Sequence, residues 1–122
     1  MILVALGSSL CFSGRTPSGN IIGALGALGR VASLRSRSRL YASPAWPDAA
    51  DPDFVNAVAA IDTPLSPEAL LAALQAIEAG FGRRRGGPPN GPRTLDLDII
   101  DYRGLVRSAA LPPPVLPHPR AH

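Results

Sequence analysis

Gly91-Pro92-Arg93-Thr94-Leu95-Asp96-Leu97-Asp98-Ile99-Ile100 is the most informative segment of this 122-residue chain. Apolar and polar side chains alternate along it with a period of two, which is typical of a β-strand with one buried face. Leu97 and its apolar neighbours anchor the strand in a core, while Asp96 and Asp98 share the opposite face. Positions on one face lie about 6.5–7 Å apart along a strand. The sequence therefore predicts two carboxylates side by side on one rigid element.

The paired carboxylates have two interpretations. Two like charges this close repel each other unless a cation lies between them. Their oxygens suit one Mg²⁺, or a pair of ions about 3.5–4 Å apart, as in sites of phosphoryl transfer. The alternative is that Asp96 and Asp98 line the solvated face of a half-exposed strand. The positive charge upstream of the pair favours the metal site.

Four arginines precede the aspartates, namely Arg83, Arg84, Arg85 and Arg93. The glycines and prolines in residues 86–92 predict a loop between them. Guanidinium groups bind phosphate oxygens bidentately, so such a loop beside two carboxylates fits a polyphosphate with its Mg²⁺. Clustered like charges repel each other without a ligand, and we therefore expect a mobile loop that closes over the polyphosphate as a lid.

The same patterns divide the rest of the chain into further strands and helices. The expected order is strand, helix, strand, strand, helix, strand, at residues 2–6, 21–30, 34–41, 54–61, 67–80 and 95–102. This β-α-β-β-α-β order predicts an α+β, ferredoxin-like fold, in which a four-stranded antiparallel sheet carries both helices on one face. The other face of such a sheet is open to a ligand.

The two helices are signalled unequally. The second has an N-cap candidate in Ser66, a proline at its first position and a terminating Gly80. Its apolar stripe is Leu70, Leu74, Ile77 and Phe81, and Gln75 and Glu78 share a neighbouring face. The first helix contains three glycines, each costing about 1 kcal/mol relative to alanine. In the strand at residues 34–41, the three alternating arginines are interpreted as a solvated face.

Phe54 and Asn56 form a second candidate constellation, because they share one face of their strand. An aromatic plane beside a carboxamide can stack on a flat heterocycle and read its hydrogen-bonding edge. The alternative is a core phenylalanine beside an asparagine that satisfies a nearby loop. From the residues alone the two interpretations are equal.

Composition limits the remaining function classes. The net charge is +3 and all twelve basic residues are arginines, which fits either an anionic ligand or a coding bias toward arginine. The single cysteine excludes an internal disulfide and a cysteine-based metal site. No apolar run approaches the roughly 20 residues that span a membrane. We expect a cytoplasmic, monomeric protein that binds neither membrane nor nucleic acid.

Several motifs, in order along the chain, resemble those of the 6-hydroxymethyl-7,8-dihydropterin pyrophosphokinases of folate biosynthesis. They are Leu6-Gly7-Ser8-Ser9-Leu10, Ser38-Arg39-Leu40-Tyr41-Ala42-Ser43-Pro44, Asp53-Phe54-Val55-Asn56, Ile77-Glu78 with Gly82-Arg83 and Arg85, residues 91–99, and Leu116-Pro117-His118-Pro119-Arg120. The resemblance implies transfer of diphosphate from ATP to the hydroxymethyl group of the pterin, with AMP as the other product. It also implies Mg²⁺, with two ions expected.

The resemblance assigns roles residue by residue. It implies Mg²⁺ ligands at Asp96 and Asp98, and catalytic roles for Arg83, Arg93, Asp96 and Asp98. It implies ATP contacts from Gln75, Glu78, Arg83, Arg85, Arg93, Ile99 and His118. It implies pterin contacts from Ser43, Pro44, Trp46, Phe54, Asn56 and Asp96. This makes stacking on a pterin the better interpretation of Phe54.

The chain also departs from the family pattern. Ser9 stands where asparagine is usual, and Asn90 where a bulkier residue is common. The family continues beyond the residues that end this chain, so we expect a single domain of residues 1–122 with a core at 1–102, a Pro-rich tail at 103–122 and the usual C-terminal segment missing. One alternative function is a remnant that binds ATP and pterin but turns over weakly. Another is a small RNA-binding module, which the six aromatics and the acidic strand disfavour.

Overall fold

The alternating aspartate segment forms strand β5, Asp96–Tyr102, at one edge of an antiparallel sheet. The computed structural model describes residues 1–44, 53–83 and 93–105. Its other strands are β1, Ile2–Ser8; β2, Ser33–Arg37; β3, Tyr41–Ser43; and β4, Phe54–Asp62. The sheet order is β2-β4-β1-β5, and β3 pairs with β4 beyond the end of β2.

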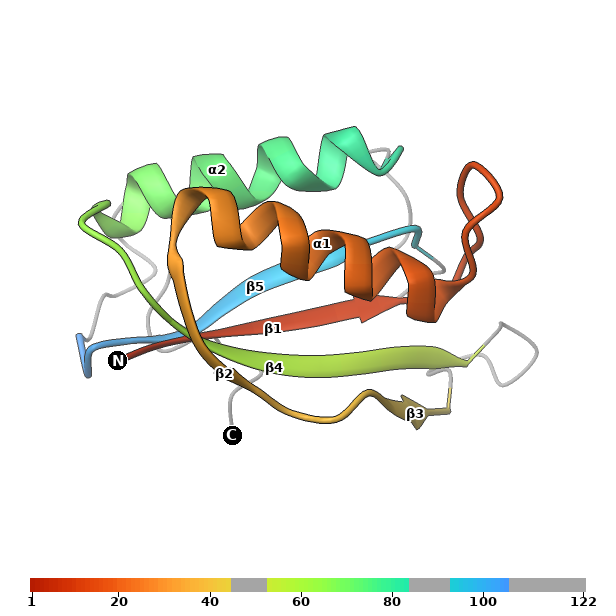
Figure 1. Cartoon of the computed structure of the whole chain (residues 1–122), viewed down its shortest axis with the longest axis horizontal. Coiled ribbons are helices and arrows are strands. Elements are labelled where there is room, and N and C mark those ends of the chain that lie inside the picture. The colour runs from red at the N-terminus through yellow and green to blue at the C-terminus, as the bar shows by residue number, and fades with distance from the viewer. Residues whose placement is uncertain (45–52, 84–92, 106–122) are drawn as a thin grey trace, which may run out of the picture.

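Both helices lie on the same side of this sheet (Figure 1). They are α1, Pro17–Val31, and α2, Pro67–Gly80. The core between helices and sheet is fully enclosed around the side chains of Val4, Leu28 and Leu74. The α+β, ferredoxin-like arrangement expected from the sequence is confirmed. Within residues 1–44, 53–83 and 93–105 no helix covers the opposite face of the sheet, which we call the helix-free face.

Helix α1 begins four residues before the predicted start at residue 21, because Thr16 and Pro17 form an N-terminal cap. Thr16 accepts a hydrogen bond from the Gly19 N–H at 3.1 Å and Pro17 occupies the first turn, the same cap that Ser66 and Pro67 give α2. Each cap satisfies an N–H that has no partner within its helix. This cap and the buried face of α1 outweigh the cost of its glycines.

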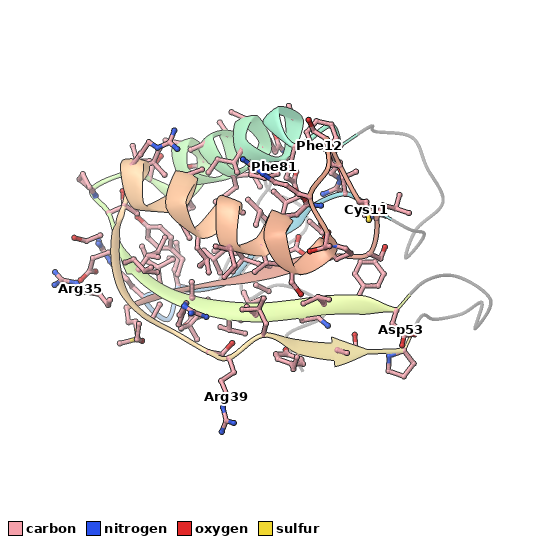
Figure 2. All side chains as sticks on the ribbon, turned by 45° about the vertical axis from the view of Figure 1, so that its right-hand side comes forward. Cys11, Phe12, Arg35, Arg39, Asp53 and Phe81 are labelled. Atoms are coloured by element: carbon pink, nitrogen blue, oxygen red, sulfur yellow. The ribbon has the colours of Figure 1, made fainter. Side chains whose placement is uncertain are left out.

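The single strand predicted at 34–41 is wrong, because the segment forms two short strands. The pairing with β4 shifts register between Leu34 and Ser36, and β2 ends at Arg37. Ser38 then pairs with Val58 through both its N–H and its hydroxyl. The arginines of this segment are exposed, as predicted, and Arg35 and Arg39 project away from the rest of the protein (Figure 2).

A glycine turn ends α2 and directs the chain toward β5. Gly82 has φ of +78°, and a Cβ there would lie 2.3 Å from the Phe12 ring. Figure 2 labels Phe12 and Phe81 at this end of the helix pair. Only glycine satisfies both conditions at this position.

Gly82→Ala is expected to destabilise the fold by more than Gly104→Ala. Gly104 has φ of +76° but nothing within 4 Å of an added Cβ, so its substitution isolates the backbone cost of about 1–2 kcal/mol. At Gly82 the collision with Phe12 adds about 1–3 kcal/mol of overpacking. Urea unfolding of both variants measures the difference, and equal losses would show that the Phe12 contact is unimportant.

Candidate functional site

The helix-free face brings the two predicted constellations into one row of the sheet. In the strand register Asp96 lies opposite Gly7, Gly7 opposite Asn56, and Asn56 opposite Tyr41. Residues that are directly opposite share a face. The carboxylate strand and the Phe54–Asn56 strand therefore flank β1 on the same surface.

Gly7 lets two side chains of β4 lie close to the middle of this row. A Cβ added to Gly7 would lie 3.4 Å from Asn56 Oδ1 and 3.5 Å from Phe54 Cδ1. Gly7 itself is buried. A glycine inside a strand often marks such a close approach to the backbone.

The amide of Asn56 is held in a fixed orientation. Its Nδ2 donates a hydrogen bond to Ser43 Oγ at 2.7 Å, and Ser43 lies opposite Phe54 in the register. Ser43 therefore orients the asparagine of the candidate heterocycle site, and its own contact with a pterin stays a prediction. Pro44 follows and is exposed, whereas Trp46 lies outside the described residues.

Asp96 is paired with Arg83, which reaches it from the end of α2. The distance from Arg83 Nη1 to Asp96 Oδ1 is 2.7 Å, and the same nitrogen also bonds to Glu78. Both side chains are largely buried, with 21% of Arg83 and 17% of Asp96 exposed. The arginine and aspartate that the sequence predicted to act together are thus in direct contact.

Glu78 lies beneath this pair. Only 5% of it is exposed, and it accepts a hydrogen bond from the Leu97 N–H at 2.7 Å. Burial raises the pKa of Glu78, against the opposing effects of the Leu97 N–H and of Arg83. The carboxylate anchors the outer edge of β5 between the two aspartates, and its contact with a nucleotide stays a prediction.

The other predicted ATP-binding residues are spread around the site. Gln75 is partly exposed on α2, one turn before Glu78. The side chain of Ile99 lies in the core with 2% exposed, so any contact with a ligand would come from its backbone. Arg93 is partly exposed directly ahead of β5. Arg85, His118 and most of the expected lid lie outside the described residues.

The two aspartates fit the share of Mg²⁺ ligands that a protein usually supplies. Asp96 and Asp98 are both partly exposed on the helix-free face, while Leu97 and Ile99 are buried. Mg²⁺ is commonly bound by one or two carboxylates together with substrate phosphates and waters. Within residues 1–44, 53–83 and 93–105, no three His, Cys, Asp or Glu residues gather around one point.

Sequence reasoning missed a polar cluster that supports the start of β5. Ser8, Ser9 and the fully buried Asn20 hydrogen-bond the backbone of Arg93 and Thr94. The available signal was Asn20 itself, a polar residue directly beside Ile21 on the buried face of α1. Periodicity alone could not show which backbone groups it bonds.

A groove between α1 and α2 lies apart from this site. It is lined by small residues such as Gly26 and Ala76, with Arg15 and Arg30 also on its walls. These residues belong to the helix layer, whereas the aspartates and Asn56 occupy the helix-free face. No described helix is both long enough and apolar enough to cross a bilayer.

Comparisons with known proteins identify relatives of this chain. The family model of the 7,8-dihydro-6-hydroxymethylpterin-pyrophosphokinases matches residues 3–122. A 2-amino-4-hydroxy-6-hydroxymethyldihydropteridine pyrophosphokinase of Pseudomonas aeruginosa is 48% identical over 101 residues, 81% of this chain and 59% of that protein. A protein of the same name in Methylorubrum extorquens is 43% identical over 68% of this chain and 51% of that protein. Another, in Pseudomonas putida, is 44% identical over 84% of this chain and 82% of that protein. The chain thus spans little more than half the length of the first two relatives.

Proposed function

Because the chain belongs to the 7,8-dihydro-6-hydroxymethylpterin-pyrophosphokinase family, we propose that it transfers diphosphate from ATP to 6-hydroxymethyl-7,8-dihydropterin. The hydroxymethyl oxygen bonds to the β-phosphorus of ATP, the bond to the α-phosphate oxygen breaks, and AMP leaves. The hydroxyl proton passes to solvent. The observation that carries the proposal is the register of three strands, in which Gly7 lies opposite Asp96 on one side and opposite Asn56 on the other. The candidate metal ligands and the candidate heterocycle site therefore lie on either side of β1.

The pterin lies against β4 in this proposal. Phe54 stacks on the ring system and the oriented amide of Asn56 reads its polar edge. Ser43 holds that amide, and Pro44 and Trp46 belong to the same pocket wall. Gly7, which has no side chain, lets Phe54 and Asn56 lie close to β1.

The phosphates lie against β5. Asp96 and Asp98 would hold two Mg²⁺ ions, which when bound would polarise the attacked phosphate and lower the pKa of the substrate hydroxyl. Arg83 and Arg93 bind the transferred oxygens and neutralise the charge that develops on them. Further ATP contacts are proposed for Gln75, Glu78, Arg85, Ile99 and His118.

Catalysis then rests on position and electrostatics, since no described residue near the aspartates is suited to act as a strong general base. Holding the hydroxyl and the β-phosphate in line removes the entropic cost of their encounter. We propose that the protein acts as a cytoplasmic monomer without nucleic-acid or membrane partners.

The reaction is tested directly by phosphorus NMR of ATP, Mg²⁺ and 6-hydroxymethyl-7,8-dihydropterin with the protein. The proposal expects AMP and a pterin diphosphate in equal amounts. Formation of ADP, or release of AMP that does not depend on the pterin, would contradict it.

Phe54→Ala is expected to weaken pterin binding by about 1–3 kcal/mol, the scale of aromatic stacking on a heterocyclic base. The affinity for ATP should change much less, because the carboxylates lie on the other side of β1. Phe54→Leu serves as the matched control that keeps apolar volume without a π face. Calorimetry with each ligand measures both affinities, and equal losses for both would identify Phe54 as a purely structural residue.

A further inference from the structure

A fully buried asparagine connects the first helix to the strand of the aspartates. Asn20 lies on the first turns of α1 with 0% exposed. Its Nδ2 lies 2.9 Å from Leu10 O, 3.1 Å from Thr94 O and 3.2 Å from Ser8 Oγ. The two carbonyl oxygens can only accept, so the amide nitrogen has to face them.

The same short segment is held from the end of β1. Arg93 N–H donates to Ser9 Oγ at 3.0 Å, and Arg93 O accepts from the N–H groups of Ser9 and Leu10 at 2.8 and 3.1 Å. Ser8 Oγ donates to Thr94 O at 2.6 Å. Both residues that precede the buried Leu95 are therefore fixed at their backbone, and Asn20 links this clamp to the helix.

The clamp contains two polar atoms that its neighbours leave unsatisfied. Within residues 1–44, 53–83 and 93–105, Asn20 Oδ1 and Thr94 Oγ1 are buried without a hydrogen-bond partner, and unsatisfied buried groups cost free energy. The same amide supplies a donor to Leu10 O and Thr94 O, which an apolar side chain of similar shape would not supply. The clamp thus keeps a buried polar side chain despite this cost, and its bonds fix the geometry of the Arg93–Thr94 backbone.

We propose that Asn20 is a positioning residue for Arg93, which it orients toward the phosphates held at Asp96. Asn20 is buried and does not contact the substrate. It acts by fixing the backbone at Arg93, from which the arginine side chain extends. The inference rests on the proposed function for the role of Arg93. Displacement of a charged group by about 1 Å can reduce a reaction rate about a hundredfold.

The test compares Asn20→Leu with a matched control at the other end of α1. Thr63 is also buried, with its hydroxyl bonded to Val31 O and Leu65 N–H, so Thr63→Val removes comparable bonds far from Arg93. Asn20→Leu is expected to lower kcat by about a hundredfold with the KM for pterin unchanged. Thr63→Val should leave both constants unchanged.

A double-mutant cycle separates positioning from general destabilisation. In an Arg93→Ala background, Asn20→Leu should lower kcat by less than twofold, because the group that it positions is absent. Equal losses in both backgrounds, or no loss in either, would overturn the proposal. Ser9→Ala, which removes the side-chain bond to Arg93 N–H, replaces Asn20→Leu in the cycle if the latter does not fold, with the same expected outcome.

Hydrogen exchange distinguishes failure of this inference from failure of the proposed function. The amide of Arg93 should exchange at least about tenfold faster in Asn20→Leu than in the wild type and in Thr63→Val. Unchanged exchange would overturn the clamp itself. A second outcome combines faster exchange of the Arg93 amide in Asn20→Leu with full activity in Arg93→Ala. This result would overturn the positioning role of Asn20, and it would show that the proposed role of Arg93 is wrong.

Discussion

Asp96→Asn and Asp98→Asn are each expected to lower Mg²⁺-dependent diphosphate transfer about a thousandfold. Each variant keeps the side-chain shape but removes a charge that holds the metal. Metal stabilisation of phosphoryl transfer is worth several kcal/mol, and each 1.36 kcal/mol is a factor of ten in rate. The rate of AMP formation at saturating ATP and pterin measures the effect.

The fold should tolerate both substitutions. Arg83 remains bonded to Glu78 when Asp96 is neutralised. Because only 17% of the Asp96 side chain is exposed, Asp96→Asn should lower the free energy of unfolding by about 1–3 kcal/mol, and Asp98→Asn should lower it by less than about 1 kcal/mol. Asp101→Asn is the matched control on the same strand, because Asp101 bonds to Gly104 N–H in the turn after β5. Comparable loss of activity in Asp101→Asn, or retained Mg²⁺-dependent ATP binding in the double aspartate variant, would contradict the metal assignment.

Glu78→Ala is expected to produce a large loss of stability, about 3 kcal/mol. The substitution leaves the Leu97 N–H without its acceptor and removes one of the two carboxylates that neutralise Arg83. Removing one partner of a buried ion pair typically costs 3–5 kcal/mol, and the remaining Asp96 contact puts the expected loss at about the lower limit. Denaturant unfolding measures the loss.

Glu68→Ala on the same helix is the control for this prediction. Glu68 is exposed in the first turn of α2, where a carboxylate contributes about 0.3–1 kcal/mol through the helix dipole. A loss at Glu78 no larger than that at Glu68 would show that the anchor beneath β5 does not stabilise the fold.

The pH dependence of stability tests the buried state of Glu78 separately. Because burial raises its pKa, the folded chain binds this proton more readily than the unfolded chain does. Glu78 therefore contributes stability that is fully present below its unfolded pKa, about 4.5, and that is lost as pH rises through the raised folded pKa. The free energy of unfolding of the wild type minus that of Glu78→Gln should fall over this interval. A difference that rises with pH would contradict the assignment.

The sequence predicted those strands and helices correctly in which a single hydrophobic period, of two or of about 3.6 residues, continued from one end to the other. The alternation at Asp96 and Asp98 placed β5 and its two faces correctly, and Ser66 with Pro67 located the start of α2. Thr16 and Pro17 give the equivalent cap at the start of α1. The prediction for this helix rested on its apolar periodicity, which begins only at Ile21. The break at Ser38 was not predictable from alternation, because it depends on hydrogen bonds to Val58 in another strand.

The site was predicted in its parts, whereas its connections required the structure. Phe54, Asn56 and the aspartates were identified from their residue types, but only the register shows that Gly7 lies between them. Glu78 could have been placed in the core, because it follows Leu70 and Leu74 at intervals of four residues. Its bonds to Arg83 and to Leu97 are tertiary, and no local pattern reports them.

We propose that Mg²⁺-ATP binds on the helix-free face beside Gly7. Paramagnetic broadening by Mn²⁺, added with ATP in place of Mg²⁺, tests this directly in amide NMR spectra. The strongest broadening is expected at residues 96–98, with weaker broadening at Gly7 and sharp signals for Gly26 and Ala76 in the groove between the helices. Broadening centred on that groove, or spread evenly over the protein, would contradict it.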